Sequence, residues 1–167
     1  MLPLGTTAGG KVHTFSSGDS YTATGFNAAT GPQPNPVNPL GNPPYPGDTS
    51  SDGPNWVGFL STTYNESFIL TYNFAYDGAT VDSGLVPPYL PTATSMKQQV
   101  QNEFLPIYGN QPSSTPWASD DSLFAFFIGI NDIGNSYTQK NESSVQASIF
   151  VEYARLLEQV CILSRYI

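Results

Sequence analysis

The sequence has little charge, one cysteine and one histidine. Charged residues make up 11% of the 167 residues, and five basic against thirteen acidic side chains give a net charge of −8 at pH 7. This balance argues against a nucleic-acid partner, which binds basic surfaces, and against anionic membrane surfaces. The single cysteine, Cys161, permits no internal disulfide. No apolar run approaches the roughly 18 residues that are needed to span a bilayer.

Metal and nucleotide sites are not indicated either. One histidine, one cysteine and scattered carboxylates show no metal-ligand spacing. Gly18 and Gly25 do not match the glycine pattern of a dinucleotide-binding loop. We therefore expect a monomer without metal or cofactor, whose partner is a small substrate.

The polar composition favours an extracellular protein. Low charge is combined with abundant Ser, Thr and Asn and with 13% aromatic residues. Two glycosylation sequons, Asn65-Glu66-Ser67 and Asn141-Glu142-Ser143, are compatible with secretion. Residues 1–7 lack the apolar segment of a signal peptide.

Apolar runs and helical spacing alternate along the chain. They predict strands over 12–17, 68–73 and 123–130, and helices over 56–60, 94–108 and 144–160. This alternation implies an α/β fold, with a parallel sheet and helices on both faces. The continuous apolar run of residues 123–128 is typical of a central strand covered on both faces. A stretch rich in Pro and Gly, residues 31–53, predicts a long ordered loop near a site.

Three motifs follow the three predicted strands. They are Gly18-Asp19-Ser20, Asn73-Phe74-Ala75-Tyr76-Asp77-Gly78 and Gly129-Ile130-Asn131-Asp132. Ligands of parallel sheets bind beyond the carboxyl ends of the strands, so the motifs are expected to form one site. Ser20 offers a nucleophilic hydroxyl and a backbone N–H. Gly78 offers a second backbone N–H and Asn131 a side-chain amide, and such donors stabilise the oxyanion of acyl transfer.

Several residues near these motifs are candidates for contacting a substrate. Asp19 adjoins the serine, and Tyr21, Tyr45 and Trp56 carry rings that could stack on sugars. Taken singly, each signal also has an ordinary structural interpretation, as a turn, a helix cap or a core anchor.

Together the motifs resemble those of SGNH hydrolases of the GDSL type, and most closely the fungal acetylesterases of carbohydrate esterase family 16. The resemblance runs from about residue 12 to about residue 160, and it is carried by residues 15–26, 38–47, 53–57, 73–82 and 127–137. It implies a flavodoxin-like three-layer α/β/α fold with five parallel strands. It also implies that Ser20 is the nucleophile, that Ser20, Gly78 and Asn131 form the oxyanion hole, and that acetyl esters on plant cell-wall oligosaccharides are hydrolysed.

The chain departs from the family pattern at two places. Asp77 stands where the family has a small residue, and we expect its carboxylate to point to solvent. The Asp-x-x-His motif that supplies the family's catalytic base has no match after Asn131. His13 is a poor substitute, because the strand before Ser20 would place it roughly 20 Å away at the other end of the sheet.

These departures predict an incomplete domain. With the strand order 2-1-3, the third strand would be left at an edge. We expect residues 1–11 to be a disordered stub, residues 12–160 a partial SGNH hydrolase domain and residues 161–167 an atypical tail. The chain would then be an N-terminal portion of a longer gene product, or a read-through into non-coding sequence. Two other functions are compatible with the motifs: a carbohydrate-binding remnant that has lost catalysis, and a GDSL lipase or phospholipase that acts on longer acyl chains.

Overall fold

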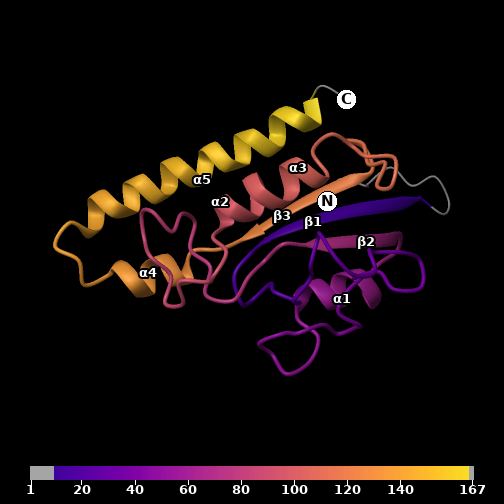
Figure 1. Ribbon diagram of the computed structural model, residues 1–167, viewed down its shortest axis with the longest axis horizontal. Helices are drawn as coiled ribbons and strands as arrows, with labels where there is room; N and C mark the ends of the chain where they lie inside the picture. Colours follow the sequence, from indigo (N-terminus) through magenta and orange to yellow (C-terminus); the bar gives the residue numbers. More distant parts are fainter. Residues whose placement is uncertain (1–9, 166–167) are drawn as a thin grey trace.

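A computed structural model describes residues 10–165 of the chain. Three parallel strands, β1 (Lys11–Gly18), β2 (Phe68–Asn73) and β3 (Ser122–Phe127), form a sheet in the order β2-β1-β3 (Figure 1). The register pairs Phe15 with Tyr72 on one side and with Phe124 on the other. The predicted parallel sheet and strand order are confirmed.

Helices lie on both faces of this sheet, as an incomplete α/β/α domain requires. On one face, the Ser61 hydroxyl of α1 (Trp56–Thr62) lies 2.6 Å from the Thr71 hydroxyl of β2. Side chains alternate along a strand, so Leu70 and Tyr72 point to the opposite face. There they pack in the main core with residues of the segment 96–107 and of α5 (Glu142–Arg165). Figure 1 shows α5 running along that segment.

The main core is unusually aromatic, and Phe15 lies at its centre. The Phe15 ring is 2% exposed. Its centroid lies 5.1–5.8 Å from the ring centroids of five neighbours: Tyr72, Phe104, Tyr108, Trp117 and Phe124. These neighbours come from β2, β3 and the segments between them, so the Phe15 side chain contacts residues from most of the elements around the core.

The helix predicted over 94–108 is present but is not regular. Ser95 caps its start, and the chain then runs through α2 (Met96–Gln98), the π-helix η1 (Gln99–Phe104) and α3 (Leu105–Ile107). Pro106 offers a physical reason, because proline has no N–H and its ring collides with the carbonyl four residues earlier. The wider π turn just before Pro106 relieves this conflict.

The third predicted strand is shorter than expected, and a helix was missed. β3 ends at Phe127, and α4 (Ile130–Ser136) begins three residues later, after Gly129 with φ +127°. β3 is paired with β1 alone in the described part of the chain, and most of its residues are partly exposed. Within residues 10–165 it therefore lies at an edge of the sheet, as the strand order predicted, and its apolar run is not fully covered there.

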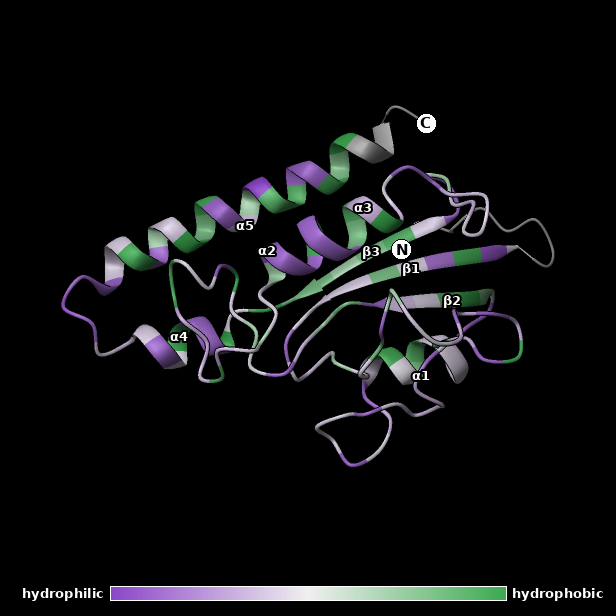
Figure 2. Cartoon of the chain, viewed as in Figure 1, coloured by the Kyte–Doolittle hydropathy of each residue, from purple (hydrophilic) through white to green (hydrophobic). Residues whose placement is uncertain are grey.

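The predicted chain ends differ from the structure where the two can be compared. β1 already begins at Lys11, inside the predicted stub, and α5 continues through residues 161–165, which were expected to be an atypical tail. Residues 1–9 and 166–167 lie outside the described residues. Hydrophobic and hydrophilic residues are interspersed along α5 (Figure 2), which buries Ile149, Leu156 and Val160 against the core.

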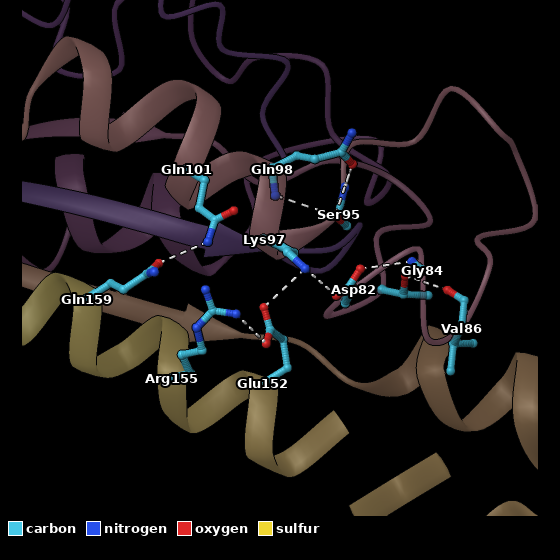
Figure 3. Close-up of polar contacts among 11 residues, drawn as sticks. Asp82, Gly84, Val86, Ser95, Lys97, Gln98, Gln101, Glu152, Arg155 and Gln159 are labelled. Atoms are coloured by element: carbon cyan, nitrogen blue, oxygen red, sulfur yellow. Dashed lines mark hydrogen bonds and ion pairs between the residues drawn. The ribbon is translucent and has the colours of Figure 1, made fainter. Parts of the chain in front are cut away.

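An ion-pair network holds α5 to the rest of the fold. Lys97 of α2 reaches Asp82, which follows the second motif, at 2.7 Å and Glu152 of α5 at 3.4 Å (Figure 3). Arg155 also contacts Glu152, at 3.2 Å. The network ties the loop after β2 to both helical segments on the same face of the sheet.

Candidate active site

The three motifs meet at Gly18, the last residue of β1. The Gly18 carbonyl accepts a hydrogen bond of 3.1 Å from the N–H of Tyr76, in the motif that follows β2. Gly18 also pairs with Phe127 at the end of β3, and a Cβ added to Gly18 would lie 2.4 Å from the Phe127 carbonyl oxygen. Only glycine allows this close approach. The segments that carry Ser20, Gly78 and Asn131 therefore leave the sheet at the same rim.

Ser20 lies in a tight turn that Asp19 shapes. The Asp19 carbonyl accepts hydrogen bonds of 2.9 Å from the N–H groups of Thr22 and Ala23, and its carboxylate accepts one of 3.0 Å from Tyr21. Asp19 is 2% exposed, whereas Ser20 is partly exposed. Burial raises the pKa of Asp19, and the negative charge of Asp77 adds to the effect. The Asp19 carboxylate thus faces the backbone of its own turn, and a contact with substrate stays a prediction.

Gly78 and Asn131 are held next to each other. Gly78 has φ +76°, a left-handed conformation that favours glycine. The Asn131 side chain, in the first turn of α4, donates a 2.9 Å hydrogen bond to the carbonyl of Ala79, the residue after Gly78. The amide of Asn131 keeps a second N–H for another acceptor. Both carboxylate oxygens of Asp132 accept from the N–H of Val81, at 3.0 and 3.1 Å, so a second contact joins the same two segments.

Ser20 opens onto a cleft of about 570 Å³. Trp56 and Tyr21 line it, as expected for substrate contacts, and the Tyr21 ring lies 5.7 Å from that of Phe127. Tyr45 is not among the lining residues and lies instead near Gly58 of α1. Sequence reasoning missed four other residues that line the cleft, Ser50, Ser51, Asn55 and Phe127. The only available signals were the long loop 31–53 and the motif around Asn55.

Asp77 is exposed to solvent, as predicted, at the edge of the cleft of Ser20. Its side chain is exposed, and its carboxylate accepts a 3.1 Å hydrogen bond from the hydroxyl of Ser50. Because Ser50 also lines the cleft of Ser20, this bond links the segment of Gly78 to the wall of the cleft.

His13 is buried within the sheet, at the end away from Ser20. It is 1% exposed, its ring stacks on those of Phe15 and Tyr72, and neither ring nitrogen has a hydrogen-bond partner within residues 10–165. Burial lowers the pKa of His13, and the positive charge of Lys11 contributes. His13 pairs with Ser122 near the start of the sheet, whereas Ser20 follows its other end. It therefore cannot act as the base for Ser20.

Asn55 joins α1 to the turn of Ser20. Its side-chain oxygen accepts from the N–H groups of Val57 and Gly58, which caps α1, and its amide donates to the carbonyls of Thr22 and Ala23 at 3.0 and 2.9 Å. All four bonds lie in a buried region.

Asn55→Ala is expected to lower the free energy of unfolding by about 2 kcal/mol, because the cap is lost and the Ala23 carbonyl loses the Asn55 amide, whereas the Thr22 carbonyl keeps its hydrogen bond from Asn73. Urea unfolding followed by circular dichroism measures the change. Asn65→Ala is the matched control, since the Asn65 amide makes one hydrogen bond, to Ser67 in a partly exposed loop. Equal free energies of unfolding for the two variants would contradict the conclusion that Asn55 holds α1 to the turn of Ser20.

The ionisation of Asp132 is expected to make the stability of the fold depend on pH. It is 1% exposed and lines a second cavity of about 400 Å³ beside α4 and α5. Burial is the main cause that raises the pKa of Asp132 to about 6; the charges of Asp19 and Asp82 contribute to this rise, and the hydrogen bond from Val81 opposes it.

Since the folded-state pKa of Asp132 lies above the unfolded value, its contribution to stability is present below about pH 4 and is lost as pH rises through about 6. Asp132→Asn is expected to reduce the loss of stability between pH 4 and pH 8 by an amount of order 2 kcal/mol. Urea unfolding at each pH tests this. Glu103→Gln is the comparison. Burial raises the pKa of Glu103 to about 7, so this variant is expected to remove a different part of the stability loss, at higher pH. An unchanged pH profile in Asp132→Asn would refute the prediction.

Residues 10–165 contain no group of three or more His, Cys, Asp or Glu side chains that could hold a metal ion. Within the same residues, no helix is both long and apolar enough to cross a membrane.

Comparison with known proteins identifies the family. The model of the GDSL-like lipase/acylhydrolase family matches residues 15–161. The chain belongs to this family. It is also 47% identical over 136 residues to an acetylesterase of Thermothelomyces thermophilus. The match covers 81% of this chain and 44% of that protein, so the GDSL chain spans less than half the length of this curated relative.

Proposed function

We propose that this GDSL chain carries the nucleophile and the oxyanion-stabilising groups of a serine carboxylic ester hydrolase. Ser20 is the nucleophile. The N–H groups of Ser20 and Gly78 and the side-chain amide of Asn131 form the oxyanion hole. The observation that carries the proposal is the convergence of the three segments at the rim beyond Gly18, where Ser20 opens onto a cleft.

The proposed chemistry is acyl transfer in two steps. The Ser20 oxygen bonds to the ester carbonyl carbon, and the carbonyl oxygen takes up the negative charge and is stabilised by the three N–H groups. The Ser20 hydroxyl proton passes to solvent, the C–O bond to the alcohol breaks, and the alkoxide takes a proton from solvent and leaves as the alcohol. Water then adds to the acyl carbon, the bond to Ser20 breaks, the acid is released and the Ser20 oxygen regains a proton. The family's Asp-x-x-His base is absent from the 167 residues. A site with the hole but without the base retains about 10³–10⁴ of the rate enhancement over water.

We infer that the substrate is an acetyl ester of a cell-wall oligosaccharide, and that the protein acts outside the cell as a monomer. The name of the Thermothelomyces thermophilus relative supports acetyl esters. The exposed rings of Tyr21 and Phe127 beside Ser20 support a sugar as the alcohol, because such rings stack on apolar sugar faces. The sequon at Asn141, which is exposed, supports secretion and glycosylation.

Reaction with a fluorophosphonate tests the assignment of Ser20. In this reaction the Ser20 oxygen bonds to phosphorus, fluoride leaves, and the hydroxyl proton goes to solvent. Mass spectrometry of the digested protein is expected to find the adduct on Ser20 and not on Ser50 or Ser51, which line the same cleft and serve as internal controls. An adduct distributed over all three serines, or the absence of any adduct, would refute the proposal. Initial rates on aryl acetates against aryl octanoates then separate an acetylesterase from a lipase.

A further inference from the structure

Gln99 is a buried polar side chain that lies outside the three motifs. It begins the π-helix η1 and is 0% exposed. Its side-chain oxygen accepts from the N–H of Gly18, and its amide donates to the carbonyl of Gly18, both at 2.9 Å. The amide also donates to the carbonyl of Thr94 at 2.9 Å. Gln99 thus binds both polar groups of one residue, 81 positions earlier in the chain.

The residue that Gln99 holds is the one at which the site segments meet. Gly18 stands two residues before Ser20, and its carbonyl also accepts from Tyr76. A side chain on Gly18 would collide with the Phe127 carbonyl and with Thr22. The peptide groups on both sides of Gly18 are therefore held by Gln99, by the segment after β2 and by the end of β3. Their orientation sets the direction in which the chain enters the turn of Ser20.

Packing alone does not require glutamine at this position. A buried amide is costly unless it is hydrogen-bonded, and an aliphatic side chain of similar size would fill the space without that cost. The place of Gln99 at the start of a π-helix is also notable, because π turns occur frequently at functional sites.

We propose that Gln99 is a positioning residue for Ser20. By pairing with both polar groups of Gly18, it fixes the end of β1 so that the hydroxyl and the N–H of Ser20 face the same ester carbonyl. This inference rests on the proposed function, since it assigns a role in the reactivity of Ser20.

A glutamate at this position separates a positioning role from a merely structural one. When protonated, the carboxyl of Gln99→Glu can still accept from Gly18 N–H and donate to Gly18 carbonyl. When ionised, it has no donor and repels that carbonyl. Burial raises the pKa of such a carboxyl above its usual ~4.3, so the change falls within an accessible pH range.

The experiment measures the rate of fluorophosphonate reaction at Ser20 between pH 5 and pH 8, in the full chain and its variants. We expect Gln99→Glu to react within about threefold of wild type at pH 5 and at least about tenfold more slowly at pH 8. Gln99→Leu is expected to react at least about tenfold more slowly at every pH. Near-UV circular dichroism is recorded for each sample.

The matched control is Gln101→Glu. Gln101 lies on the same π-helix, and its amide donates to the side chain of Gln159 on α5 at 3.2 Å, away from Gly18 (Figure 3). Its ratio to wild type is expected to stay constant with pH.

Three results would overturn the inference. One is a wild-type rate in folded Gln99→Leu. If that variant does not fold, the second result is decisive: a ratio of the Gln99→Glu rate to the wild-type rate that does not change with pH. In Gln99→Glu, a loss of reactivity at pH 8 that coincides with a loss of the near-UV signal would show that Gln99 acts on folding alone. If Ser20 does not react in the wild-type chain, the proposed function itself is refuted. This outcome is distinguishable from the three results above.

Discussion

Replacing Asn131 with alanine is expected to lower the rate of ester hydrolysis by about 10²–10³, the effect of removing one oxyanion donor. The N–H of Asn131 that is not bonded to Ala79 is available to the developing oxyanion. The charge on that oxygen is greater in the transition state than in the bound ester, so kcat is expected to fall much more than KM rises. Initial rates on 4-nitrophenyl acetate, corrected for the rate without protein, measure both constants.

Asn135→Ala is the matched control for this variant. Asn135 lies on the same helix α4, and its amide also donates to a backbone carbonyl, that of Pro87 at 3.1 Å. Its removal deletes a comparable bond from the same helix without touching the site, so kcat is expected to stay within about twofold of wild type. Equal losses in the two variants would mean that α4 matters only as a structural element, and Asn131 would then not be an oxyanion donor.

Phe15→Ala is expected to lower the free energy of unfolding by about 3–5 kcal/mol, the usual cost of removing a buried phenylalanine. Phe15 is 2% exposed and contacts five aromatic neighbours from several elements. β1 is the central strand, so it cannot move inward to fill the cavity without disturbing its pairing with β2 and β3. The linear dependence of unfolding free energy on urea concentration measures the loss.

Phe150→Ala gives the comparison for an exposed ring of the same type. Phe150 lies on α5 and is 72% exposed, so its removal is expected to change stability by no more than about 0.5 kcal/mol. A cost for Phe15→Ala as small as that of Phe150→Ala would contradict the central position of Phe15 in the core.

The sequence alone was sufficient for the first two strands and for the meeting of the three motifs, whereas the end of the third strand was placed three residues too late. β2 was predicted at its observed bounds, and β1 within one residue at each end. These elements are specified by short apolar runs between glycine, proline and asparagine, which are local signals. The meeting of the three motifs followed from a general property of parallel sheets, whose carboxyl ends share one rim.

Other features of this GDSL chain depend on contacts between residues far apart in sequence, so only the tertiary structure decided them. Gln99 meets Gly18 across 81 residues, and Asn55 meets Thr22 across 33. Nothing near either side chain indicates its partner. Likewise, the burial of His13 follows from the rings of Phe15 and Tyr72 that cover it. Local sequence sets what the backbone forms, whereas the packing of distant segments decides which polar groups are paired, buried or open to a substrate.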